Sequence, residues 1–141
     1  MIRPAGVADL AALMEIENAC FDRPYSAESV LGDLKGDKVK TFVFQDGDNI
    51  LGFISVYVFL DEANLQQIAV LESHRKKGYA KALILNAIDY LKQNNIKKFY
   101  LEVNETNKIA ISLYEKLGFK KVITRKNYYG SNSAMVYEML L

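Results

Sequence analysis

The segment from His74 to Ala80 reads His-Arg-Lys-Lys-Gly-Tyr-Ala, and these residue types can bind a phosphate. It lies between a predicted strand and a predicted amphipathic helix. The glycine lets the backbone approach a ligand closely, and the helix start offers unpaired N–H groups and the positive end of the helix dipole. Arg75, Lys76 and Lys77 add positive charge. The segment is therefore either an anion site or an ordinary solvated basic loop.

Other kinds of site have weaker support. The loop is neither a Walker loop nor a dinucleotide fingerprint, because no Gly-Lys-Ser/Thr follows and one glycine is present. His74 is the only histidine and stands beside three basic residues, which is more typical of a phosphate-facing or solvated group than of a base. Cys20 is the only cysteine, so an internal disulfide is excluded and a reducing compartment is indicated. No residues have metal-ligand spacing, and we expect no metal site.

Sequence periodicity predicts the elements that hold these residues. Helices are expected over 8–20, after a cap at Ser26, over 79–91, and after a cap at Thr106; strands are expected over 41–45, 50–59, 65–70, 98–103, 119–123 and 134–140. The 79–91 helix carries one continuous apolar stripe. The strand–helix–strand unit around it requires a right-handed crossover and a parallel pair, and the flanking hairpins are antiparallel. We therefore expect an α/β fold (α+β in some schemes), with a mixed sheet covered by helices on both faces.

Composition limits the classes of protein. The 141 residues fit one domain spanning 1–141, and half of them are hydrophobic. The net charge of +1 gives no global field directed at nucleic acid or a membrane. No stretch approaches the roughly 20 apolar residues of a membrane span, and the N-terminus lacks the apolar run of a signal peptide. These features predict a cytoplasmic protein.

Arg75-x-x-Gly78-x-Ala80 resembles the Gln/Arg-x-x-Gly-x-Gly/Ala signature of the GCN5-related N-acetyltransferases (GNAT superfamily). The resemblance extends over about residues 60–129, through 60–70, 101–107 and 110–119. Arg125-Lys126-Asn127-Tyr128-Tyr129 is similar to the tail of one branch, the RimI-type ribosomal-protein alanine N-acetyltransferases. The chain departs from that branch at Asn104 (usually Arg), Ala80 (usually Gly) and Tyr25 (often Trp), and it lacks the acidic pair before the last strand.

The resemblance implies the GNAT fold, a mixed, splayed sheet of six or seven strands flanked by about four helices. It also implies acetyl-CoA as co-substrate, with the loop amides holding the pyrophosphate. By the same resemblance Glu102 is the base and Tyr114 the acid that protonates the leaving thiolate; an exposed structural glutamate and a core aromatic are the alternatives. The implied cofactor-binding residues are Ile68, Ala69, Val70, Arg75, Lys76, Lys77, Gly78, Tyr79, Ala80, Lys81, Asn107 and Ala110.

The acceptor implied by the resemblance is the N-terminal α-amine of a protein or peptide, such as a ribosomal protein, acetylated by direct transfer. Tyr25, in the turn before the second helix, and Tyr128 and Tyr129, on the expected loop between the last two strands, would line the acceptor slot. An α-amine has a pKa of about 7.7–8.0 against about 10.4 for lysine, so modest help from a base suffices. A homodimer is left open.

Two rival functions remain at this point. One is acetylation of a small amine, for instance a polyamine or an amino acid. The other is a CoA-binding module without turnover. The presence of both Glu102 and Tyr114 argues against the second, since a degenerate site would be free to lose them.

Overall fold

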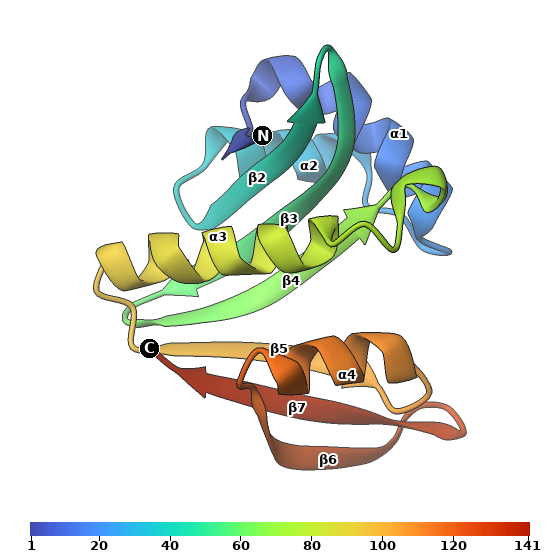
Figure 1. The fold of residues 1–141 in the computed structure, drawn as a ribbon, viewed down its shortest axis with the longest axis vertical. Coiled ribbons are helices and arrows are strands. Elements are labelled where there is room, and N and C mark those ends of the chain that lie inside the picture. Colours follow the sequence, from blue (N-terminus) through green and yellow to red (C-terminus); the bar gives the residue numbers. More distant parts are fainter.

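The computed structural model describes all 141 residues as one seven-stranded sheet with four α-helices (Figure 1). The strand order is β1-β2-β3-β4-β5-β7-β6. The strands are β1 (Ile2–Pro4), β2 (Val39–Asp46), β3 (Asn49–Phe59), β4 (Glu62–Val70), β5 (Lys98–Asn104), β6 (Lys120–Tyr129) and β7 (Asn132–Leu140). The helices are α1 (Leu10–Cys20), α2 (Ala27–Lys35), α3 (Tyr79–Gln93) and α4 (Lys108–Lys116), with short 3-10 turns at Val7–Asp9 and Glu72–His74. The mixed sheet with four helices was predicted correctly.

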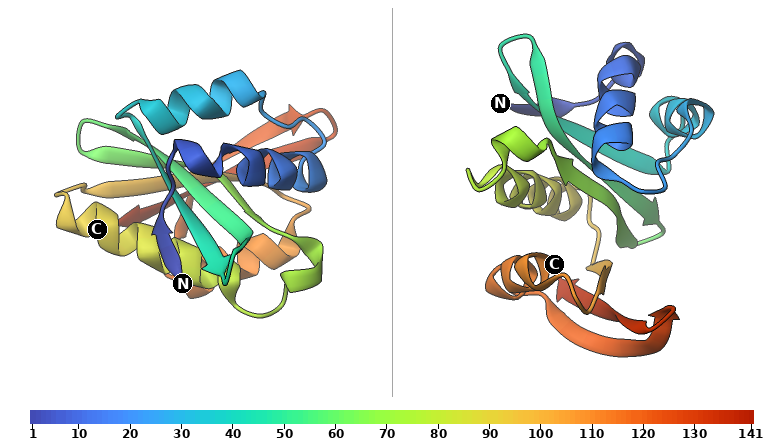
Figure 2. Two further views of the ribbon diagram at one scale, coloured as in Figure 1. Left: turned by 90° about the horizontal axis from the view of Figure 1, so that it is seen from above. Right: turned by 90° about the vertical axis from the view of Figure 1, so that its right-hand side faces the viewer.

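The helices cover both faces of the sheet, as expected. Helices α1 and α2 lie on one face, and α3 and α4 lie on the other (Figure 2). The larger apolar core is on the α3 and α4 face, and it includes the predicted stripe of α3 (Leu83, Ile84, Ala87, Ile88 and Leu91). A smaller core under α1 and α2 contains Leu13, Ile16, Val30, Val43, Phe53 and Ala69. Strands β2, β3 and β4 therefore contribute side chains to both cores.

Two local predictions were wrong, and one strand was missed. Strand β1 was not predicted; it pairs with β2 through only three residues. Strand β6 extends to Tyr129, so Tyr128 and Tyr129 lie at the end of a strand and not in the loop. Helix α4 is capped by Asn107 and not by Thr106: the Asn107 side chain accepts a hydrogen bond from Ala110 N at 3.2 Å, whereas the Thr106 hydroxyl donates to Asn104 Oδ1 at 2.9 Å.

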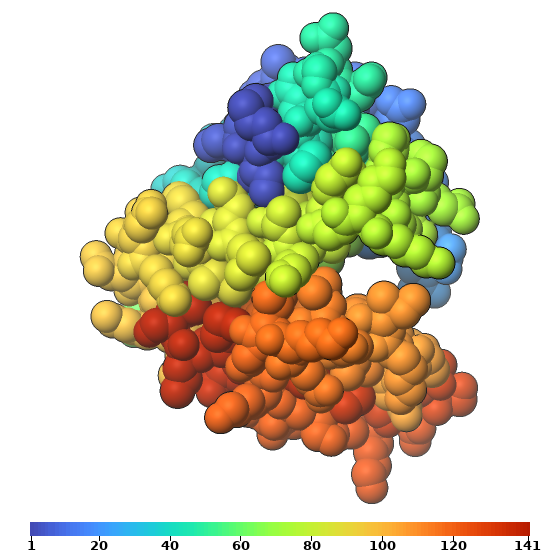
Figure 3. Space-filling model, viewed as in Figure 1, coloured from blue at the N-terminus to red at the C-terminus, as the bar shows by residue number.

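The sheet splits between β4 and β5. These two strands form a parallel pair only from Glu62–Lys98 to Asn64–Tyr100. Directly beyond that point Gln66 is an extra residue in β4, because Leu65 lies opposite Val56 and Gln67 lies opposite Ser55. Such a bulge bends the strand that carries it. The two strands then part, and Figure 3 shows the resulting opening between the segment that enters α3 and the segment that enters α4.

Candidate active site

The edge of β4 offers main-chain groups to the opening. Leu71 N donates to Leu51 O on β3 at 2.9 Å, and main-chain direction alternates along an antiparallel strand. The amides and carbonyls of Ile68 and Val70 therefore point away from β3, toward the opening. Ala69 directs its main chain to β3 and its side chain into the core under α1. Of the three predicted cofactor residues on β4, Ile68 thus presents its amide and carbonyl and Val70 its amide, because Val70 O accepts from Arg75 Nε; Ala69 supports them.

The start of α3 has the parts of the predicted anion site. Gly78 caps the helix with φ 83° and ψ 11°, a left-handed conformation that suits glycine. The first intrahelical bond runs from Ala82 N to Gly78 O at 3.0 Å, so the N–H groups of Tyr79, Ala80 and Lys81 have no acceptor within the helix. A Cβ at Gly78 would meet no atom within 4 Å. The space beside Gly78, at the start of the helix, is therefore open.

Two side chains of the predicted phosphate loop are engaged within the protein. Arg75 Nε donates to Val70 O at 2.8 Å, and Arg75 Nη2 lies 3.7 Å from Cys20 Sγ. The ring of Tyr79 stacks on Phe44 with centroids 4.1 Å apart. These residues position the loop and the helix start, and Tyr79 offers a ligand only its amide. Lys76 and Lys77 are exposed, and their charges remain available to an anion.

Strand β5 and helix α4 form the other wall of the opening. Leu101 and Val103 are buried in the α4-side core, so Glu102 projects from the opposite face of β5. Glu102 is exposed, and its Oε1 lies 3.3 Å from Arg125 Nη1 on β6. Tyr114 of α4 is 6% exposed and packs edge-on against Phe119. Burial raises the pKa of the Tyr114 hydroxyl to about 12. Its hydroxyl makes no hydrogen bond to another protein group, and it stays protonated at neutral pH.

Asn107 and Ala110, the two predicted cofactor residues at the start of α4, are hydrogen-bonded to each other. The Asn107 side-chain oxygen accepts from the Ala110 amide. That oxygen is therefore used as a helix cap, and the side-chain NH₂ group is the part of Asn107 left to a ligand.

Tyr128 and Tyr129 extend the β5 wall. Their rings meet edge-on with centroids 5.2 Å apart, and the Arg125 guanidinium lies 5.7 Å from the centre of the Tyr128 ring. Burial, and then the negative charge of nearby Glu102, raise the pKa of Tyr129. The β6–β7 turn beyond them bends toward the side of the sheet on which α1 and α2 lie (Figure 2). The structure therefore brings Tyr129 to the candidate base.

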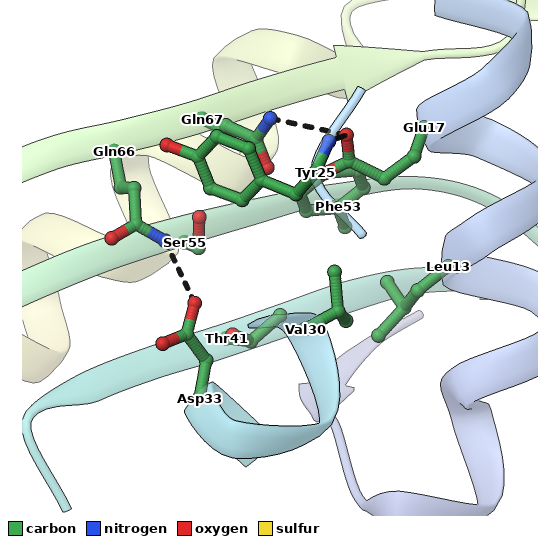
Figure 4. A pocket seen from close by; sticks show the side chains of 10 residues that line it. All are labelled: Leu13, Glu17, Tyr25, Val30, Asp33, Thr41, Phe53, Ser55, Gln66 and Gln67. Atoms are coloured by element: carbon green, nitrogen blue, oxygen red, sulfur yellow. Dashed lines mark hydrogen bonds between the residues drawn. The ribbon is translucent and has the colours of Figure 1, made fainter. Parts of the chain in front are cut away.

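Tyr25 lies apart from that pair, beside a small cavity of about 20 Å³ between α1, α2 and the sheet (Figure 4). Burial, and then the charges of Glu17 and Asp33, raise the pKa of Tyr25. Its backbone N–H donates to Glu17 Oε2 at 3.0 Å. Sequence analysis missed Glu17 because an acid in an amphipathic helix is ordinarily a solvated side chain. Its ring makes no aromatic pair with Tyr128 or Tyr129, which pair with each other.

No three His, Cys, Asp or Glu side chains gather in a way that could hold a metal ion. None of the helices is long and apolar enough to cross a bilayer.

Comparison with known proteins decides the family. Residues 10–119 match the acetyltransferase (GNAT) family. This chain belongs to the GNAT family. The [ribosomal protein bS18]-alanine N-acetyltransferase of Haemophilus ducreyi is 36% identical over 129 residues, which cover 92% of this chain and 88% of that protein. The enzyme of the same name from Escherichia coli K12 is 35% identical over 121 residues, covering 86% and 81%.

Solved structures agree with this assignment. The crystal structure of the ribosomal-protein-S18-alanine N-acetyltransferase from Escherichia coli superimposes with a TM-score of 0.91 at 30% identity, covering 99% of this chain and 92% of that one. Arabidopsis thaliana NAA60 in complex with acetyl-CoA has the same fold, with a TM-score of 0.87 at 22% identity over 100% and 98% of the chains. This GNAT protein is therefore an N-acetyltransferase that uses acetyl-CoA, and the predicted fold, enzyme class and co-substrate are confirmed.

Proposed function

We propose that this enzyme acetylates the N-terminal α-amine of a protein, and that the natural acceptor is a ribosomal protein. The observation that carries the proposal is the identity of 35–36% with two enzymes named for the alanine of ribosomal protein bS18, over 86–92% of this chain. Such similarity across nearly the whole chain includes both walls of the opening. A cytoplasmic location and a homodimer stay predictions.

The β4 wall would hold acetyl-CoA through its main chain. Ile68 and Val70 would bond the amides of the pantetheine arm as an added strand does. The open amides at the start of α3 would bond the pyrophosphate, with Lys76 and Lys77 adding charge. Gly78 and Ala80 leave room for that approach, and the Asn107 amide would reach the arm from the other wall.

Glu102 would act as the general base. An amine attacks a thioester only in its neutral form, and a carboxylate in reach, directly or through one water, can take its proton. Glu102 is exposed on β5, and it is close enough to Tyr129 of β6 for its charge to affect that residue. An incoming amine can therefore reach Glu102 from solvent beside Tyr129. Arg125, 3.3 Å from the carboxylate, would hold it in a defined orientation.

Tyr114 would donate to the sulfur that leaves. With a pKa of about 12, its hydroxyl is protonated throughout the neutral range. An alkyl thiol has an unperturbed pKa of about 8.5, so outright proton transfer would be unfavourable in water. Inside an apolar site the thiolate is destabilised as well. A hydrogen bond from Tyr114 therefore stabilises the developing negative charge, and the proton follows as the sulfur leaves.

The test is acetylation of a matched panel: peptides with a free small N-terminal residue, the same peptides with a blocked N-terminus and an internal lysine, and spermidine. Mass spectrometry locates the acetyl group. We expect α-amine acetylation of the free peptides and little turnover of the others. Acetyl found mainly on lysine side chains, or turnover of spermidine with none of peptides, would refute the proposed acceptor.

A further inference from the structure

Glu17 of α1 is a glutamate whose side chain is almost completely removed from solvent. Its exposed fraction is 1%, whereas Glu15, two positions earlier, is exposed. Removing a carboxyl group from water is costly unless defined partners compensate it. The positions of those partners therefore depend on Glu17.

Two neutral donors hold the Glu17 carboxylate, and no basic side chain does. Oε2 accepts from Tyr25 N at 3.0 Å and from Gln67 Nε2 at 3.2 Å. The ion pairs of the protein are Arg3–Asp9 and Arg125–Glu102, and neither involves this residue. Hydrogen bonds to an ionised acceptor are stronger than those between neutral groups. The carboxylate is thus bound to both donors at once.

These two bonds join three elements beside the opening (Figure 4). Glu17 comes from α1, Tyr25 from the turn before α2, and Gln67 from β4, directly after the bulge at Gln66. The bond to Glu17 is the one hydrogen bond that the Tyr25 backbone N–H makes. A second bond, from Gln66 Nε2 to Asp33 Oδ2 at 3.1 Å, ties α2 to the bulge itself.

The space enclosed by these groups is small. It measures about 20 Å³, which is room for one water molecule. The buried hydroxyl of Ser55 lines it without a partner. The Tyr25 side chain also packs against the smaller core under α1 and α2. The polar link between the turn and β4 is the Glu17 carboxylate, which accepts from both Tyr25 N and Gln67 Nε2.

We infer that Glu17 is a positioning residue for the acceptor: its carboxylate fixes Tyr25 against β4, and through Tyr25 it sets the affinity for the amine substrate without touching it. The inference rests on the proposed function, in which Tyr25 lines the acceptor slot. The donor side is separate, because neither the start of α3 nor the main chain of Ile68 and Val70 is bonded to Glu17. We therefore expect acetyl-CoA binding to depend on this carboxylate much less than acceptor binding does.

A purely structural glutamate would behave differently. Its loss would lower the melting temperature and would either spare both substrates or weaken both alike. A positioning role requires that the KM for the amine and the KM for acetyl-CoA respond differently.

The first experiment replaces Glu17 by Leu and by Gln, with Glu15→Leu on the exposed face of the same helix as the matched control. Glu17→Leu leaves the Tyr25 N–H unpaired, and it should raise the KM for the acceptor about tenfold or more, while the dissociation constant for acetyl-CoA, from calorimetry, stays near that of wild type. Glu17→Gln keeps an oxygen that can accept both bonds, so it should restore most of the acceptor KM. Glu15→Leu should change neither constant.

The second experiment does not depend on turnover. The chain has no tryptophan, so Tyr25→Trp introduces a single tryptophan at the turn, whose emission can be excited selectively above the absorption of the tyrosines. Adding Glu17→Leu to that variant should shift its emission to the red and increase quenching by acrylamide, because the turn is released. Gln67→Leu, which removes the partner on β4, should do the same to a smaller degree and serves where Glu17→Leu does not fold.

The outcomes separate this inference from the proposed acceptor. If the wild-type enzyme prefers spermidine or lysine peptides, the proposed acceptor is wrong, and the KM split measured with the preferred amine still tests Glu17. Two results would overturn the positioning role whatever the acceptor is. One is that Glu17→Leu raises the acceptor KM and the acetyl-CoA dissociation constant equally. The other is that Glu17→Leu leaves the tryptophan emission and its quenching unchanged.

Discussion

The two walls of the opening present different kinds of chemical group. The β4 wall, with the start of α3, presents main-chain amides and carbonyls whose directions follow from the bulge at Gln66 and from the left-handed Gly78. The wall built by β5, β6 and α4 presents side chains, of which Glu102, Tyr114 and Tyr129 are the candidates for chemistry and acceptor contact. Main-chain groups survive most substitutions, whereas a side-chain group is lost with one. Single substitutions should therefore reduce activity mainly on the second wall.

The largest effect is expected at Glu102. Glu102→Gln keeps the shape of the side chain and removes the proton acceptor, so kcat should fall by on the order of 10²-fold or more, with acetyl-CoA affinity nearly unchanged. Steady-state kinetics and calorimetry measure the two. Arg125→Met is the matched variant, because it breaks the 3.3 Å ion pair and leaves the carboxylate. It should reduce kcat far less. Equal losses in the two variants would mean that the ion pair, and not the base, is what matters.

On the β4 wall, Gly78 is the residue at which a single substitution should have a large effect. A glutamate there would place a negative side chain in the open space at the start of α3, and CoA affinity should fall about thirtyfold, equivalent to ~2 kcal/mol of repulsion and steric exclusion. Gly78→Ala is the control: it adds the strain of a left-handed residue, about 1–2 kcal/mol of stability, without charge or length. Its CoA affinity should stay close to wild type. A folded Gly78→Glu protein that binds CoA normally would contradict the assignment of this loop.

Tyr114, on the second wall, should affect both the rate of the reaction and the stability of the protein at high pH. Tyr114→Phe loses one hydroxyl, and kcat should fall about tenfold, the value of one hydrogen bond to developing charge.

The stability of the protein should also depend on pH through Tyr114. The pKa of its hydroxyl in the folded protein, about 12, lies above the ordinary value of 10.0. The contribution of this group to stability is therefore complete below pH 10 and is lost as the pH rises toward 12, by about 2–3 kcal/mol in all.

Urea unfolding at pH 9 and at pH 11 tests this, because the other tyrosines cancel in the comparison. The wild type should lose more stability than Tyr114→Phe between the two values. Parallel losses would show that Tyr114 is not protected by burial.

Different parts of the molecule could be predicted from the sequence to different degrees. The glycine of the α3 loop and the apolar stripe of α3 have strong local patterns, and both lie where the sequence placed them. Strand β1 has three residues, too few for a periodicity. The bulge at Gln66 depends on which residue of β3 lies opposite, and that pairing is a tertiary contact. Glu17 reads as a surface acid until α1 is packed on the sheet.

The smallest effect is expected at Tyr129 on the second wall, because this residue would contact the peptide acceptor and would take no part in proton transfer. Its side chain is 41% exposed, so part of the ring is available to a peptide. A tyrosine offers a flat apolar face and a polar tip. Tyr129→Ala should therefore raise the peptide KM about fivefold, or ~1 kcal/mol, and leave the acetyl-CoA KM alone.

Tyr129→Phe separates the ring from the hydroxyl, and it should retain most of the affinity if the ring supplies the contact. Val122→Ala, an exposed apolar truncation on the same strand, is the matched control and should change neither constant. Equal changes in both KM values for Tyr129→Ala would mean that this residue supports the sheet beside Glu102. The acceptor would then be held by the Tyr25 side of the opening, and the Glu17 variants would show the larger effect on the peptide KM.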